Sequence, residues 1–140
     1  MSDPRAAFSI FCDDIRLEAG NKLSFMGVYG SEIIFSAPSP VTWPKLCIVT
    51  WLICDVDDLP KKVNAKVYAP NSEVELASTE METNFTGMLN DGAVRGWVRL
   101  VLQPTDILLT EEGYFRVQVE ADGVSIKAGR LKVRFKPPAA

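Results

Sequence analysis

Apolar and polar residues alternate along much of this chain, most clearly toward its C-terminal end. Leu131, Val133 and Phe135 alternate with basic residues, and the segment 115–120 alternates in the same way. A period of two places the apolar side chains on one face of a β-strand. The pair Asp122-Gly123 lies between the two segments and suits the positive φ angles of a type I′ turn. The pattern therefore predicts a β-hairpin in the final third of the chain.

Turn residues separate further strands in the first two thirds of the chain. The pair Gly20-Asn21 lies between the segments 15–19 and 22–29, which predicts a second tight hairpin. The segment 45–54 is apolar at nearly every position, as expected for a central strand that is covered on both faces. Further strands are predicted at 63–68, 73–79 and 95–103.

The number and spacing of these strands predict the fold class. About seven to nine short strands with turn signals between them indicate an all-β chain, and we expect an immunoglobulin-like antiparallel β-sandwich. Residues 81–89 carry apolar side chains at helical spacing, but poor helix formers interrupt them, so a long loop is predicted at 80–94. One domain is expected over residues 1–140, with a frayed tail at 137–140.

A motif in the first third of the chain resembles a known family. The stretch Cys12-Asp-Asp-Ile-Arg-Leu-Glu18 is followed by Gly20-Asn-Lys-Leu-Ser24 and by Met26-Gly-Val-Tyr29. This order resembles a bacterial family of small proteins of unknown function, whose members open with Cys-Asp-Asp-x-Arg-x-Glu and continue with Gly-Lys-Leu-x-x-x-Gly-x-Tyr. The resemblance implies a β-rich protein of bacterial or phage origin. It implies no activity.

Composition narrows the functional classes. The chain has 140 residues, no histidine and a formal net charge of −3 at pH 7. Without histidine, the most common general base near neutral pH is missing, and Cys12, Cys47 and Cys54 lack the usual partner that activates a thiol. We therefore expect neither an enzyme nor a cofactor. The cysteines are interpreted as small apolar residues of the core.

Net charge, the first residues, the length of apolar runs and the number of cysteines indicate the cellular location of the protein. The net acidity argues against general nucleic-acid binding, which usually shows as a basic domain. The first residues lack the basic start and apolar stretch of a secretory signal, and no apolar run is long enough for a membrane-spanning helix. An odd number of cysteines fits reduced thiols. We therefore expect a cytoplasmic protein without a membrane span.

Two acidic clusters suggest a calcium site as an alternative to no metal at all. Calcium prefers carboxylate oxygens, and the loops at one end of a sandwich can bring several of them together. The opposing interpretation is that these aspartates begin turns by bonding their own backbone, and no complete calcium-loop motif is present. The calcium candidates are Asp13, Asp14, Asp55, Asp57 and Asp58.

A basic stripe follows the last predicted strand, and its side chains could hold phosphates or an acidic partner. The opposing interpretation, which we favour, is a solvated sheet edge, because lysine and arginine at an edge discourage aggregation. Glu75 and Glu120 on neighbouring strands would also neutralise the stripe. The stripe consists of Arg130, Lys132, Arg134 and Lys136.

Two long loops are the preferred contact surface. Prolines stiffen the loop 36–44, and a stiff loop that presents an aromatic side chain loses little entropy on docking. The opposing interpretation is that Trp43 folds back over the core. The loop 80–94 exceeds a dozen residues, a length that is often functional. The candidate partner contacts are Trp43, Phe85, Met88 and Leu89.

These observations predict a non-enzymatic β-sandwich that acts as a protein-interaction or structural component. It would bind a protein partner or a second copy of itself. The alternative is a sandwich that binds calcium or a lipid headgroup. Fold class alone does not decide between them, because sandwiches serve many functions.

Overall fold

The computed structural model describes residues 5–20, 22–82 and 95–136, which form eleven β-strands. The all-β prediction is confirmed, whereas the predicted number of strands was too low. The short strands β3, β4 and β9 have four or five residues each, too few for an alternating pattern to be recognised. In chain order the strands are β1 (Ala6–Glu18), β2 (Lys22–Val28), β3 (Glu32–Phe35), β4 (Val41–Lys45), β5 (Cys47–Asp55), β6 (Lys62–Tyr68), β7 (Glu75–Glu82), β8 (Arg95–Leu102), β9 (Thr105–Leu109), β10 (Gly113–Ala121) and β11 (Val124–Phe135).

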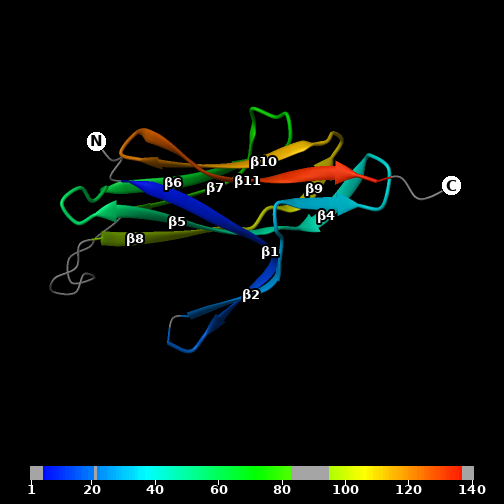
Figure 1. Cartoon of the computed structure of the whole chain (residues 1–140). Coiled ribbons are helices and arrows are strands. Elements are labelled where there is room, and N and C mark those ends of the chain that lie inside the picture. The colour runs from blue at the N-terminus through cyan, green and yellow to red at the C-terminus, as the bar shows by residue number, and fades with distance from the viewer. Residues whose placement is uncertain (1–4, 21, 83–94, 137–140) are drawn as a thin grey trace.

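Hydrogen bonding groups the strands into three sheets, of which the two larger ones pack face to face (Figure 1). Sheet A has the order β2-β1-β5-β8, sheet B has the order β3-β11-β10-β6-β7, and sheet C pairs β4 with β9. The pairing of β11 with β3 is parallel, and the other pairings in the described residues are antiparallel. Strand β1 also contacts β11, where the Ser9 hydroxyl donates a hydrogen bond to the carbonyl oxygen of Ala128 at 2.5 Å.

The core lies between sheets A and B and follows from the period of two. Leu52 from β5 and Phe115 and Leu131 from sheet B are fully buried in one contiguous cluster. Each such side chain contributes about 1.5–3 kcal/mol relative to an exposed position. The alternating positions that the sequence showed therefore fix which face of each strand points inward.

The predicted hairpin at the C-terminal end is confirmed. Ala121 pairs with Val124, so Asp122 and Gly123 form a two-residue loop. Both residues have positive φ angles, 49° and 85°. Two positive φ angles are the requirement of a type I′ turn, and aspartate and glycine meet it at low cost.

The predicted N-terminal hairpin is also confirmed, although its loop is longer. Glu18 pairs with Lys22, so three residues connect β1 and β2. Gly20 has a φ angle of 79°, which a glycine adopts without strain. Asn21 lies outside the described residues.

The last strand is not a sheet edge, and this prediction was wrong. Strand β11 has β10 on one side, and its residues Lys132–Phe135 pair with β3 on the other. The partner strand lies about one hundred residues earlier in the chain, and such a parallel pairing needs a long crossover. A local pattern in the sequence does not reveal it.

Strand β5 is central, as its apolar composition predicted. It lies between β1 and β8 in sheet A. Ile48 and Leu52 belong to the core cluster, whereas Val49 is fully buried without belonging to it. Both faces of β5 are therefore covered at this point.

Candidate binding surfaces

Trp43 is a core residue, so it does not provide the contact surface that the loop 36–44 suggested. It lies on β4 with 7% of its surface exposed. Its ring meets Tyr29 edge-on at 5.6 Å and Phe35 at 5.4 Å between centroids. The opposing interpretation, in which Trp43 covers the core, agrees with this packing. The other predicted contacts, Phe85, Met88 and Leu89, lie outside the described residues.

The structure does not assemble the five predicted calcium ligands. Asp13 and Asp14 lie just after Cys12, which pairs with Cys47 at the first residue of β5. Asp55 is the last residue of β5, so the two groups are separated by a nine-residue strand, roughly 27 Å at about 3.4 Å per residue. Among the described residues, no cluster of three or more potential metal ligands occurs. The prediction that loops at one end would join them was wrong, because β1 and β5 are antiparallel.

Several of these carboxylates have partners within the chain. The Lys45 Nζ donates a hydrogen bond to the Asp14 Oδ1 at 2.9 Å, and this bond lowers the pKa of Asp14 below its usual value. The Tyr29 hydroxyl donates to the Asp13 carboxylate. Burial and this hydrogen bond both raise the pKa of Tyr29. These contacts connect Asp13 and Asp14, at the start of the Cys-Asp-Asp motif, to residues outside the motif's first stretch.

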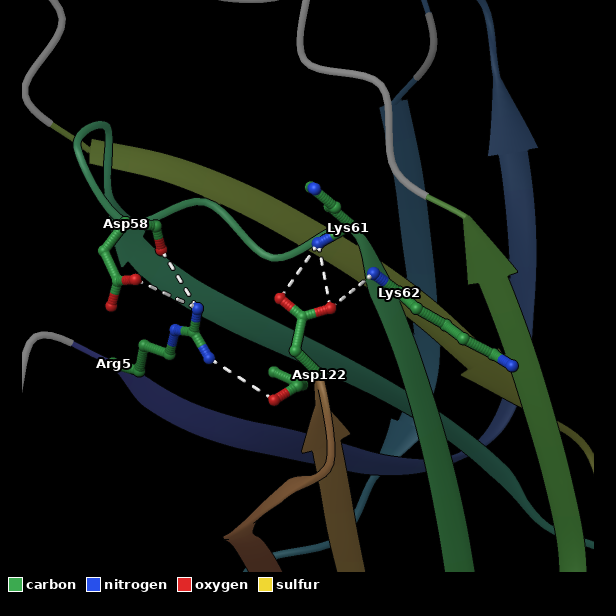
Figure 2. Close-up of polar contacts among 6 residues, drawn as sticks. Arg5, Asp58, Lys61, Lys62 and Asp122 are labelled. Atoms are coloured by element: carbon green, nitrogen blue, oxygen red, sulfur yellow. Dashed lines mark hydrogen bonds and ion pairs between the residues drawn. The ribbon is translucent and has the colours of Figure 1, made fainter.

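Asp58 and Asp122 hold one end of the sandwich together (Figure 2). The Arg5 guanidinium donates to the Asp58 Oδ1 at 3.3 Å and to the carbonyl oxygen of Ala121 at 3.4 Å. The Asp122 Oδ1 accepts the backbone N–H groups of Lys61 and Lys62, each at 3.1 Å. Asp58 and Asp122 thus connect segments that are distant in the chain. Among the calcium candidates, the Asp14 Oδ1 accepts the backbone N–H of Ile15 at 2.9 Å, a local bond of the kind that the opposing interpretation described.

All three cysteines are free and buried. Cys12 lies directly opposite Cys47 on the neighbouring strand. Burial, and then the neighbouring Cys47, raise the pKa of the Cys12 thiol from 9.0 to about 11. A raised pKa leaves little thiolate at neutral pH, which opposes a nucleophilic role. The arrangement agrees with the interpretation of these residues as apolar packing.

The outer face of sheet A, turned away from the core, carries several large apolar side chains, and the exposed Arg99 lies among them, opposite Trp51. Phe8 stacks on Trp51 with ring centroids 5.1 Å apart. Phe8 is 41% exposed, and Trp97 on β8 is 59% exposed. Ile53 on β5 is directly opposite Trp97 on β8 and Ala6 on β1, so it lies between these two residues. Soluble domains rarely expose several large apolar side chains together without a binding role.

The hairpin of β1 and β2 adds to this surface. Beyond Cys12, β1 pairs with β2 and no longer with β5, and Figure 1 shows this hairpin projecting from the body of the domain. We call residues 13–20 and 22–28 the arm. Ile15 pairs with Phe25, and Leu17 pairs with Leu23, so four apolar side chains share one side of the arm. From this side, Phe25 reaches Trp51 at 6.0 Å between ring centroids.

Sequence reasoning missed this surface for a physical reason. Strand β5 is apolar on both faces, and such a strand is usually buried on both faces. Here sheet B packs on the inner face of β5, whereas Trp51 and Ile53 point from its outer face and remain half-buried. Phe8 and Trp97 gave the available signal, because they extend the apolar outer face onto both neighbouring strands.

The basic stripe lies on the outer face of sheet B. Arg130 is placed over the ring of Tyr114, with the guanidinium carbon 4.3 Å from the ring centroid. Arg134 forms an ion pair with Glu32 at 3.6 Å. Lys136 follows the end of β11, where its backbone N–H binds the carbonyl oxygen of Phe35.

In the described part of the chain, no helix has the length and hydropathy that a membrane span needs.

Comparison with protein families gives one match. The model of a family of unknown function, DUF6941, covers residues 7–134. The chain belongs to this family. The match extends over nearly the whole domain, well beyond the motif in the first third. A search of curated proteins gives no match, and neither does a search of solved structures.

Proposed function

We propose that this DUF6941 domain is a non-enzymatic interaction component that binds a second copy of itself through the outer face of sheet A and the arm. The observation that carries this proposal is the exposure of Trp97 and Phe8, 59% and 41%, on one apolar face. Burial of apolar surface stabilises association by about 25 cal/mol for each Å² removed from water. Large aromatic residues also dominate the binding energy of protein interfaces.

A second copy fits this surface better than an unrelated partner, because one chain carries both halves of a contact. The arm projects with Leu17 70% exposed, and the outer face of sheet A exposes aromatic rings beside it. A two-fold axis would let each arm pack on the face of the other copy, which gives a closed, self-complementary interface. Strand β2 is also an unpaired edge of sheet A within the described residues, and an edge of this kind readily pairs with another chain.

Three further properties belong to the same proposal. Sheets A and B, with four and five strands, support a variant of the immunoglobulin-like sandwich. Free, buried cysteines support a cytoplasmic location. The motif resemblance supports a bacterial or phage setting, in which self-association would serve assembly. Calcium binding is not proposed, because its five candidate ligands are divided between the two ends of β5.

Size-exclusion chromatography with light scattering tests the proposal. We expect the wild-type chain to have about twice its chain mass of 15.5 kDa. Trp97→Ser removes an exposed aromatic ring from the proposed interface and should weaken the dimer by about tenfold or more, a usual effect at an interface hot spot. Leu108→Ser is the matched control, since Leu108 is 62% exposed but lies on sheet C.

Two results would contradict the proposed dimer. A wild-type chain that stays monomeric at every concentration would contradict self-association. Equal weakening by Trp97→Ser and Leu108→Ser would show that the interface lies elsewhere. Both variants should fold, because neither side chain belongs to the core cluster. Thermal unfolding should change little in Leu108→Ser, whereas Trp97→Ser should lose only the part of the stability that depends on protein concentration.

A further inference from the structure

Four cations lie close together on the outer face of sheet B. Arg116 is directly opposite Arg130 across the β10–β11 pairing, Lys127 is opposite Gln118, and Lys132 is opposite Tyr114. Like charges directly opposite one another in a sheet are unfavourable. This arrangement occurs in a chain whose net charge is −3. The general charge of the protein therefore does not explain it.

Glu75 and Glu120, which the sequence suggested as neutralising partners of the basic stripe, contact other residues. Glu75 forms an ion pair with Lys66 at 3.7 Å, and Glu120 accepts a hydrogen bond from Asn64 at 3.4 Å. Among the described carboxylates, Glu73, 94% exposed, approaches Arg116 at 3.9 Å. Within the described part of the chain, no ion pair joins Lys127, Arg130 or Lys132 to a carboxylate.

Aromatic rings and a backbone carbonyl hold the two arginines in place. The Arg130 guanidinium lies over Tyr114 at 4.3 Å, and the Arg116 guanidinium lies over Tyr68 at 5.4 Å. Arg116 also donates a hydrogen bond to the carbonyl oxygen of Ser72. Stacking of this kind fixes the plane of a guanidinium and leaves its outer N–H groups directed away from the ring. A ligand that binds here meets donors that are already oriented.

The same side chains line a depression in the surface. A groove of about 520 Å³ is bordered by Tyr114, Arg116, Gln118, Lys127 and Arg130. A second, smaller depression of about 380 Å³ shares Tyr114 and Arg116 with it. A volume of several hundred Å³ is in the usual range for small-molecule sites. At the groove, β10 and β11 change register, and Gly129 takes a φ angle of 111°.

We propose that this groove is a binding site for a phosphate group, carried by a small soluble phosphoester or by a phospholipid headgroup. A phosphate dianion offers several acceptor oxygens, which two guanidinium groups can bind in a bidentate manner while Lys127 adds a point charge. The bound dianion would also relieve the repulsion between Arg116 and Arg130. A single carboxylate has one negative charge and two oxygens, so it matches this set of donors less well.

Calorimetric titration with inorganic pyrophosphate at an ionic strength of about 0.15 M, where the screening length is about 8 Å, tests the site. Arg130→Gln should reduce the affinity by about tenfold, because it removes a charge-assisted, bidentate contact. Lys61→Gln is the matched control, since Lys61 is exposed in the loop before β6, lines neither the groove nor the proposed dimer face, and its loss changes the net charge equally. It should change the affinity by less than about twofold, because screening weakens a distant charge. Circular dichroism and thermal unfolding confirm that each variant is folded.

A second arm of the experiment identifies the source of the phosphate. Vesicles of phosphatidylcholine with phosphatidylinositol 4-phosphate are compared with vesicles of phosphatidylcholine alone. Co-sedimentation that pyrophosphate abolishes would support a lipid headgroup, and pyrophosphate binding without co-sedimentation would support a soluble phosphoester.

Three results would overturn the proposal. They are the absence of pyrophosphate binding, an equal loss in Lys61→Gln and Arg130→Gln, and binding of tetraglutamate as tight as that of pyrophosphate. The site is on the opposite sheet from the proposed dimer face, so failure of either proposal leaves the other testable.

Discussion

Individual polar side chains in this domain mainly connect segments that are distant in the sequence. Asp122 occupies a hairpin turn and accepts backbone N–H groups at the start of β6, and Arg5 joins Asp58 to the carbonyl oxygen of Ala121. These contacts lie at one end of the sandwich (Figure 2). The turn roles of Asp58 and Asp122 were visible in the sequence. Their long-range partners were not, because the loops meet only after sheets A and B have packed.

Asp122→Ala should lower the free energy of unfolding by about 1–2 kcal/mol, because two backbone N–H groups lose their acceptor and alanine is unfavourable at positive φ. The affected bonds are those from Lys61 and Lys62, each 3.1 Å long. Asp122→Asn is the control, since asparagine keeps an acceptor oxygen and tolerates positive φ, and it should lose clearly less. Urea unfolding measures both variants. Equal stability of Asp122→Ala and wild type would refute the assigned role.

The buried Cys12 thiol should make stability fall at alkaline pH. Its pKa is about 11 in the folded state against 9.0 for the ordinary thiol. Below pH 9 both states hold the proton, and between these values the unfolded state releases it first, so the free energy of unfolding decreases as pH rises. The raised pKa of Tyr29 acts in the same direction.

Cys12→Ala should show a smaller loss of stability over the same pH range, because this variant has no thiol at position 12 to titrate. Urea unfolding under reducing conditions at several alkaline pH values measures the difference. An identical pH dependence in Cys12→Ala and wild type would assign the effect to other groups.

At the scale of elements, the arm has a different environment from the rest of β1. Its first residues are Asp13 and Asp14, whose carboxylates bind Tyr29 and Lys45. Gly27 has a φ angle of 67°, and a Cβ atom there would collide with the Asp13 carboxylate. The Gly-x-Tyr end of the motif therefore has a structural explanation. The glycine makes room for the carboxylate that the tyrosine binds.

Gly27→Ala should destabilise the arm by about 1–3 kcal/mol, because positive φ is strained for alanine and the added methyl group displaces Asp13. Hydrogen exchange of the arm amides should become faster than in the wild type. Gly30→Ala is the control, since no atom lies within 4 Å of a Cβ placed there. Unchanged exchange in Gly27→Ala would contradict this account of the motif.

At the scale of the whole molecule, the two sheets present surfaces of opposite character. The outer face of sheet A exposes aromatic side chains around Arg99, which is opposite Trp51, whereas that of sheet B is basic around Arg116 and Arg130. A two-layer sandwich gives each sheet one inner and one outer face, so the outer faces are free to serve separate partners. The two proposals use this division, with self-association on sheet A and phosphate on sheet B.

The sequence by itself determined the all-β class, both hairpins and the inward positions of β10 and β11, because these depend on local turn chemistry and on a period of two. Tertiary structure decided what lies beside each strand. It moved β11 from an edge to the interior of sheet B, buried Trp43, separated the five aspartates and left the outer face of β5 partly open. These outcomes depend on contacts between residues far apart in the chain, which no local pattern encodes.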